Sequence, residues 1–437
     1  MPAATATRGD QTRQTAEPGQ LTTVPSRTLR VSPPTLRTAN GHDRDERRAS
    51  WLELFFDLVL AGAIGQLAGV FQHHPSLGTL DCFLMLFTPI WWLWVQLTFY
   101  ADRHESDDSA HRVAFLAAIL LSVGLAASAP RALAGDTTAF AVFFACLRAV
   151  QLALYARARR HLPATRALYT RYLIFFGLGG AFWVSSLAVV GSARYAFWAA
   201  GLLSDAVGAT GMISQRRRVP LNTAHLADRF QIFVLIVLGE SVARLISAAA
   251  ARPWSPQLAV VLSAALLTLA VVWRVWLTTA DRKALDGPQP IAGFAALNLP
   301  IVAGIAAGSA GLHIAILAAD GASTIGIGPR AALYGGVSVF MLASACLPSH
   351  TLSRWGRVTR IGTGMAALGL VFMGAIVLPV YLVPALTGVL VAGLAVESHR
   401  GCVAAVRAAA GWWHPAVRRQ GRPTRLPPGP DAPDSQA

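Results

Sequence analysis

Charged residues are scarce in this sequence. They make up 14% of the 437 residues, whereas a soluble domain carries about 25%. Hydrophobic residues make up 54%, and the mean hydropathy is +0.48. This composition excludes an ordinary soluble domain. It predicts an all-α fold, a polytopic transmembrane helix bundle, because the apolar residues occur in runs long enough to cross a bilayer as helices.

Lysine and cysteine are also rare. Lys283 is the only lysine, so nearly all of the formal net charge of +15 comes from arginine. The basic residues fall in short loops without a nucleic-acid-binding motif, so we expect them to orient helices and not to bind nucleic acid. The four cysteines are far apart, and three of them lie within predicted spans, which predicts neither a disulfide framework nor a metal site. No cofactor is expected. The cysteines are Cys82, Cys146, Cys346 and Cys402.

The two ends of the chain lack apolar periodicity. Residues 1–50 are rich in Thr, Ala, Pro and Arg, and residues 397–437 turn polar and end in a proline-rich segment. We expect both to be disordered cytoplasmic tails. Residues 1–50 also contain no apolar segment typical of a cleavable signal peptide, so the first span is expected to direct insertion.

Twelve segments between the tails have the length and hydropathy of membrane spans, and a count of ten to twelve is compatible with the pattern. They are residues 51–71, 80–100, 113–130, 139–156, 172–191, 195–213, 228–250, 257–280, 292–318, 332–347, 361–378 and 380–396. The last two form one apolar stretch broken only near Pro379 and Pro384. They could form a tight hairpin or one long bent helix.

The distribution of basic residues predicts the orientation of these spans. Each loop is numbered after the span that it follows. The tails and the even-numbered loops carry 30 of the 37 Lys and Arg residues, with Arg229 counted in the loop before its span. The odd-numbered loops carry four, and three lie within spans. By the positive-inside rule both termini are cytoplasmic, as are loops 157–171 and 214–227, while His73 and His74 face the other side.

Two pairs of similar phrases suggest an internal repeat. The first span reads Glu53-Leu-Phe-Phe-Asp-Leu-Val-Leu60, and the seventh reads Asp228-Arg-Phe-Gln-Ile-Phe-Val-Leu235. The second span ends in Trp94-Val-Gln-Leu-Thr-Phe-Tyr-Ala-Asp-Arg103, and the eighth ends in Arg274-Val-Trp-Leu-Thr-Thr-Ala-Asp-Arg282. We predict two parallel six-helix repeats, residues 51–213 and 228–396. The alternative is chance similarity among apolar helices.

Glu53 and Asp57 are carboxylates within the first predicted span. Their spacing of four places them on one helix face. An ionised acid in hydrocarbon is costly, so the pair is expected to face other helices, water or a cation. One interpretation is a functional site on a substrate or proton path. The other is that Glu53 lies at the headgroups, that Asp57 is tied to a neighbouring helix, and that both only lock packing.

Several other ionisable residues lie in predicted spans, and five of them are candidates for a site. Arg229, Glu240 and Arg244 share one face of the seventh span, and Glu240, near the bilayer midplane, has Arg244 one turn away as its partner. Arg148 and Asp205 lack a partner within their own helices. Pairing of Arg148 with Asp205, or of Arg148 with Asp57, would satisfy them. Together these residues form either a static charge network or a site for a proton or charged solute.

Two segments resemble the signature segments of the bacterial low temperature requirement A (LtrA) family. They are Trp51-Leu-Glu-Leu-Phe-Phe-Asp-Leu-Val-Leu with Ala63-Ile-Gly-Gln-Leu, and His225-Leu-Ala-Asp-Arg-Phe-Gln-Ile-Phe-Val-Leu-Ile-Val-Leu-Gly-Glu-Ser241. The resemblance covers about residues 45–400 and implies a multi-pass protein of the bacterial cytoplasmic membrane. The family pattern falls on Trp51, Glu53, Leu54, Phe55, Phe56, Asp57, His225, Arg229, Phe230, Gly239 and Glu240. This chain departs from the pattern at Ala61-Gly62, where bulkier aliphatic residues are usual.

The family has no established reaction or transported substrate, so the residues must favour a function. An enzyme would need a nucleophile with a base or a metal cluster. The adjacent His73 and His74 near Asp81 are a weak candidate, so we expect no catalysis. A structural or regulatory membrane protein that supports growth in the cold is the alternative. We favour transport of a small charged solute with proton coupling. The lipid bilayer is the expected partner, and the substrate and oligomeric state stay open.

Overall fold

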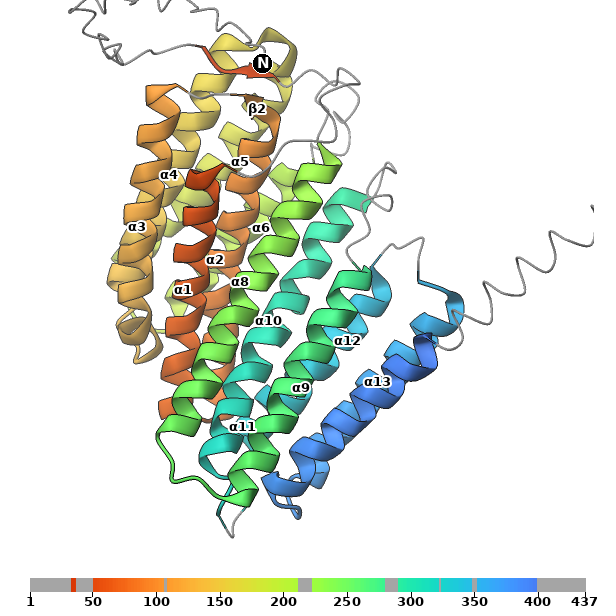
Figure 1. Cartoon of the computed structure of the whole chain (residues 1–437). Coiled ribbons are helices and arrows are strands. Elements are labelled where there is room, and N and C mark those ends of the chain that lie inside the picture. Colours follow the sequence, from red (N-terminus) through yellow and green to blue (C-terminus); the bar gives the residue numbers. More distant parts are fainter. Residues whose placement is uncertain are drawn as a thin grey trace, which may run out of the picture.

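The computed structural model describes residues 33–36, 50–105, 108–210, 222–279, 290–321, 324–347 and 352–398. The tails predicted at 1–50 and 397–437 lie almost wholly outside these ranges. Long helices joined by short connections make up the described chain (Figure 1). In Figure 1, α1, α8 and α10 lie side by side in the middle of the bundle, with α3 and α4 on one side and α13 on the other.

The described part of the first half contains six long helices. They are α1 (Trp51–His73), α2 (Leu77–Arg103), α3 (Ser109–Leu133), α4 (Thr138–His161), α5 (Arg166–Ser185) and α6 (Ala193–Ala209). Short 3-10 helices precede and follow α5, namely η1 (Pro163–Thr165) and η2 (Ser186–Ala188). Two short strands, β1 (Thr35–Leu36) and β2 (His104–Glu105), pair antiparallel.

The second half begins with the long helices α8, α9 and α10. These three are α8 (Thr223–Ala250), α9 (Pro256–Thr279) and α10 (Pro290–Leu317). A continuous helical segment follows, made of α11 (Ile327–Arg330), the π-helical η4 (Ala331–Gly335) and α12 (Gly336–Cys346). The chain then forms α13 (Arg354–Met373) and a last helix, Pro379–Ser398.

Nine helices within the described ranges are long and apolar enough to cross a membrane. The other three predicted spans, 195–213, 332–347 and 361–378, coincide with α6, the α11–α12 segment and α13. Of these, α6 has only 17 residues, and α13 carries three arginines in its first two turns. Large apolar side chains such as Leu120, Leu203 and Phe372 are exposed, as on a lipid-facing surface. The helical multi-span architecture is confirmed, and the count of twelve stays a prediction.

Side-chain caps fix where several of these helices begin. Ser50 and Glu53 form a capping box, in which the Ser50 hydroxyl accepts from the Glu53 backbone N–H and Glu53 accepts from that of Ser50. Asn222 caps α8 by accepting from the His225 backbone N–H at 3.1 Å. Such caps satisfy N–H groups that have no partner within the helix. Glu53 therefore lies in the first turn of α1, whereas Asp57 lies one turn deeper.

The two halves share an order of helix neighbours. In the first half, α1 packs on α2 and α3, α3 on α4, and α4 on α5. In the second half, α8 packs on α9 and α10, α10 on α12, and α12 on α13. The halves meet mainly where α1 contacts α8 and α10. This order agrees with the predicted repeat, which itself stays a prediction.

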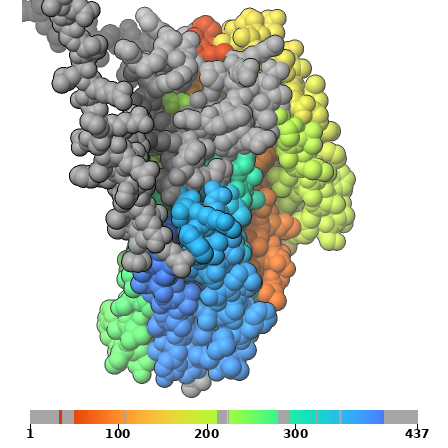
Figure 2. Space-filling view, turned by 90° about the vertical axis from the view of Figure 1, so that its right-hand side faces the viewer, coloured from red at the N-terminus to blue at the C-terminus, as the bar shows by residue number. Residues whose placement is uncertain are grey.

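The last two predicted spans form a hairpin. Turn residues 374–378 separate α13 from Pro379–Ser398. Near the start of α13, Arg360 contacts Glu397 and Thr363 lies against Gly393, so the two helices run antiparallel. Of the two arrangements left open by the sequence, the hairpin is therefore the one formed. This C-terminal part, shown in blue, covers the lower part of one face of the molecule (Figure 2).

Both ends of the described chain lie at the same end of the bundle. α1 and α8 run parallel, because Glu53 and Gly65 of α1 contact Arg229 and Arg244 of α8, respectively. α2 and α9 then return, and Glu397 reaches the end of α9 through Arg360. We call this end, with Trp51 and Ser398, the terminal end. The opposite end, with His73 and His74, is the distal end.

Candidate functional site

α2 is the central helix of the candidate site. Nearly every residue in its second half is buried, including polar ones that would not normally face a core. Trp94 and Asp102 face α1 and α8, whereas Gln96 and Arg103 face α4, α5 and α6. α2 therefore lies between two groups of buried charges.

The first group joins α1 to α8. Arg229 of α8 lies 2.8 Å from a Glu53 carboxylate oxygen and donates to Asp57 at 2.6 Å. The Trp94 indole N–H also donates to Asp57, at 2.7 Å. All four side chains are buried. The two acids predicted to share a face of α1 thus share one arginine, and they point into the bundle.

His225 extends this group to a third carboxylate. Its Nδ1 lies 2.9 Å from Asp102, and its Nε2 lies 3.5 Å from Glu53. The backbone N–H of Asn222 donates to the other Asp102 oxygen at 3.0 Å. We call Glu53, Asp57, Asp102, His225 and Arg229 the α1–α8 charge cluster. Asp102 was not predicted as a site residue, although the Asp-Arg phrase that recurs at Asp281-Arg282 was a usable signal.

Arg148 and Asp205 form the second buried group. The Arg148 guanidinium donates to Asp205 and to the side-chain oxygens of Gln96 and Gln151. Both charged side chains are almost fully buried. Pairing of Arg148 with Asp205 is therefore confirmed in the structure. The alternative pairing of Arg148 with Asp57 is wrong, because Arg229 occupies Asp57 from the α8 side.

Glu240 and Arg244 lie farther along α8, toward the distal end. They form the predicted pair at 2.9 Å. Arg244 also donates to the backbone oxygen of Gly65 and, at 3.4 Å, to Gln72, so it faces α1 as Arg229 does. The Glu240 side chain is 39% exposed, which sets it apart from the buried acids of the α1–α8 charge cluster.

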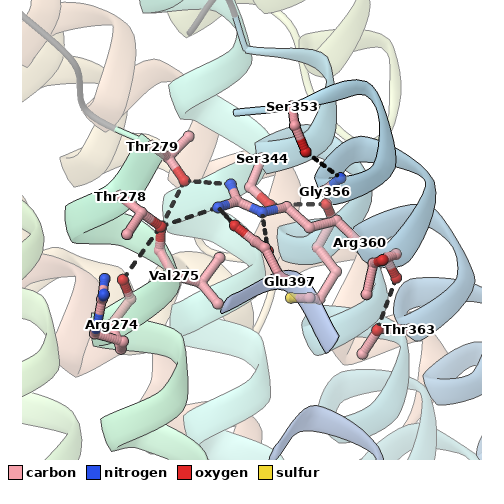
Figure 3. Close-up of polar contacts among 12 residues, drawn as sticks. Arg274, Val275, Thr278, Thr279, Ser344, Ser353, Gly356, Arg360, Thr363 and Glu397 are labelled. Carbon is pink, nitrogen blue, oxygen red and sulfur yellow. Dashed lines mark hydrogen bonds and ion pairs between the residues drawn. The ribbon is translucent and has the colours of Figure 1, made fainter. Parts of the chain in front are cut away.

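A fourth group, at the terminal end, was not predicted. Arg360 of α13 donates through Nε and Nη2 to the two Glu397 oxygens, at 3.0 and 2.7 Å, and also to Thr278 and Thr279 (Figure 3). Its guanidinium thus ties α9, α13 and the last helix together. Sequence periodicity could not find this group, because Arg360 lies at the edge of its span and is read as a loop residue.

The remaining candidates lie on the outside of the bundle. His73 and His74, the weak candidate for a metal site, are exposed. Across the described ranges, no three His, Cys, Asp or Glu side chains are arranged to hold a metal ion. The chemical groups that the structure concentrates are therefore buried carboxylates and arginines.

Long apolar helices that enclose buried ionisable pairs define a multi-pass membrane protein. The chain belongs to the bacterial low temperature requirement A (LtrA) protein family, which it matches over residues 48–396. An uncharacterized protein of Rhizobium meliloti (strain 1021) is 27% identical to it over 284 residues, which cover 60% of this chain and 68% of that protein. No solved structure matches the chain.

Proposed function

We propose that this LtrA protein transports a small charged solute across the bacterial cytoplasmic membrane and couples that movement to protons. The observation that carries the proposal is the α1–α8 charge cluster. Three carboxylates, Glu53, Asp57 and Asp102, face one guanidinium and one imidazole. When all three acids are ionised, their charge exceeds that of Arg229 alone. The cluster then has a net negative charge, which favours the binding of a proton by His225 or by a carboxylate.

The location of the cluster also favours transport. Transporters with internal repeats place their solute and ion sites where the repeats meet. We propose that residues 51–213 and 228–396 are parallel repeats and that the terminal end faces the cytoplasm. α1 and α8 are then equivalent helices, and the cluster lies between them. A relative movement of the two halves would open the Arg229 contacts to Glu53 and Asp57, and this would change the proton affinity of both acids.

Proton movement in reconstituted vesicles tests this proposal. Purified full-length protein is placed in vesicles with a trapped pH-sensitive dye, a pH gradient is imposed, and phosphate, succinate or amino acids are added. The wild-type protein should speed the collapse of the gradient with at least one solute. Asp57→Asn should lower the rate of this collapse tenfold or more. The amide retains an oxygen that accepts from Trp94 and Arg229, but it does not exchange a proton.

Asp108→Asn is the matched control. Asp108 is also a buried acid, but it pairs with Arg157 outside the cluster and caps α3, a role that asparagine fills equally well. The pH gradient should collapse at the same rate with Asp108→Asn as with the wild type. Equal rates for wild type and Asp57→Asn would favour the structural or regulatory alternative, in which the cluster only locks packing. Rates no higher than in protein-free vesicles for every solute would exclude proton-coupled transport of that panel.

A further inference from the structure

Arg103, the last residue of α2, differs from the other buried arginines in the described chain. Arg148, Arg229 and Arg360 each contact a carboxylate, and Arg194 donates to backbone carbonyls and threonine hydroxyls. Arg103 is 2% exposed, and no carboxylate among the described residues lies within ion-pair distance of it. Its one hydrogen bond runs from Nη1 to the Tyr172 hydroxyl at 3.3 Å, and its Nε and Nη2 have no acceptor.

The two neighbouring acids whose side chains the structure describes have other partners. Asp102 turns to His225 on the other side of α2, and Asp108 pairs with Arg157 at 2.6 Å. Burial lowers the pKa of His104 to about 3, so this imidazole is neutral. Its Nδ1 donates to the Tyr100 backbone oxygen at 2.8 Å, and its Nε2 accepts from Tyr169. None of these groups supplies Arg103 with a counter-charge.

Aromatic rings form the rest of the surroundings. The guanidinium carbon of Arg103 lies 5.9 Å from the centre of the Phe99 ring and 5.8 Å from that of Tyr172. These rings and the carbonyl end of α2 attract a cation, but they accept no hydrogen bond from Nε or Nη2. Two buried N–H donors without an acceptor cost stability, and a charged donor costs more than a neutral one.

The two free donors are those that bind an oxyanion side by side. Nε and Nη2 form one edge of the planar guanidinium, which matches the two oxygens of a carboxylate or phosphate. In Arg360 this same edge is filled by the two Glu397 oxygens. In Arg103 the same edge has no acceptor among the described residues.

We propose that Arg103 and Tyr172 form a binding site for a small oxyanion, a carboxylate or a phosphate. The anion accepts from Nε and Nη2 of Arg103, and it also accepts from the Tyr172 hydroxyl, whose own proton is not used by Arg103. The anion is either a free solute or the phosphate of a lipid headgroup. As a statement of the transported substrate class this inference rests on the proposed function, whereas the binding itself does not.

Thermal unfolding of the purified full chain tests the site. The protein is freed of phospholipid in an uncharged detergent and heated with succinate, with inorganic phosphate, or with sodium chloride at matched ionic strength. In a separate arm, phosphatidylglycerol is compared with phosphatidylcholine. A bound anion should raise the melting temperature by roughly 5 °C at saturation. A higher melting temperature with succinate or phosphate identifies a free solute. A higher melting temperature with phosphatidylglycerol, but with neither free anion, identifies a lipid headgroup.

Arg103→Gln should abolish the rise in melting temperature that the anion causes. Without anion this variant should be at least as stable as the wild type, because an unpaired buried charge is gone. Arg360→Gln is the matched control: it should melt earlier, since Glu397 loses its partner, and it should keep the anion response. Tyr172→Phe should raise the half-saturating concentration about tenfold, and this variant decides the question if Arg103→Gln does not fold.

Two results would overturn the site. The first is a wild-type protein that responds to none of the anions or lipids. The second is a response in Arg103→Gln, or in Tyr172→Phe where that variant decides, equal to that of the wild type. Binding that depends on Arg103 in a protein without proton-coupled transport would retain this site and remove the proposed function alone.

Discussion

At the scale of single residues, the same side-chain types have different roles according to what surrounds them. Asp205 is fully buried against Arg148, whereas Asp320 lies in a partly exposed pair with Arg252 at 3.5 Å. Removing one member of a buried pair leaves an uncompensated charge in a region of low dielectric constant. An exposed pair is screened by solvent and contributes little.

We therefore expect Asp205→Ala to lower the free energy of unfolding by about 3–5 kcal/mol. Asp320→Ala should lower it by less than about 1 kcal/mol. The measurement is unfolding of the purified protein in detergent. The double variant Asp205→Ala with Arg148→Gln should recover much of the loss. Equal effects of Asp205→Ala and Asp320→Ala would show that Arg148 finds other compensation.

Glu240→Gln separates a structural from a functional role at the most exposed of the candidate acids. Arg244 keeps the backbone oxygen of Gly65 and the side chain of Gln72 as acceptors, so we expect a loss of only about 1 kcal/mol. Unfolding in detergent and solute uptake in vesicles are measured on the same preparation. Lost uptake with retained stability would assign Glu240 to the transport path. A loss of about 3 kcal/mol or more, recovered by adding Arg244→Gln, would assign it to packing.

At the scale of helices, close approach depends on glycine in the second half. A Cβ atom added at Gly336 of α12 would lie 2.7 Å from the backbone oxygen of Gly304 in α10. Nothing lies within 4 Å of a Cβ atom at the adjacent Gly335. Small residues allow helix backbones in membranes to approach this closely.

Gly336→Ala should therefore destabilise the protein by about 1–3 kcal/mol, because the methyl group forces α10 and α12 apart. Gly335→Ala should cause no loss, since its methyl group points into open space and alanine favours helix. Both variants are compared by thermal unfolding in detergent. A stable Gly336→Ala protein would mean that the two backbones separate at little cost.

At the scale of the whole molecule, the terminal end carries most of the basic residues that the structure describes. Both described ends of the chain and the connections between α2 and α3 and between α4 and α5 lie there. The distal end has few arginines. This asymmetry underlies the prediction that the terminal end faces the cytoplasm.

Cysteine labelling in intact cells tests that orientation. In a background without the four native cysteines, Arg160→Cys should react with a membrane-impermeant maleimide only after the cells are opened. His74→Cys should react in intact cells, because it lies at the distal end. Both positions are exposed, so the difference reports sidedness and not burial. Labelling of Arg160→Cys in intact cells would reverse the orientation and remove the proposed cytoplasmic location of both tails.

Some features of this protein depend on local sequence alone. Apolar runs gave the position of each predicted helix, and the spacing of four between Glu53 and Asp57 was sufficient to place them on one face, because a helix repeats every 3.6 residues. The pair of Glu240 with Arg244 was predictable for the same reason. The segments around Trp51 and His225 were enough to indicate the family, which residues 48–396 confirm.

Contacts between helices were decided only by the tertiary structure. Arg229 contacts Asp57 across 172 residues, and His225 contacts Asp102 across 123. Periodicity tells which side of a helix is polar, but it does not tell which helix that side meets. For that reason one pairing proposed for Arg148 was correct and the other was wrong. That Nε and Nη2 of Arg103 have no acceptor is also visible only in the packed bundle, because it depends on Asp102 and Asp108 pairing with other residues.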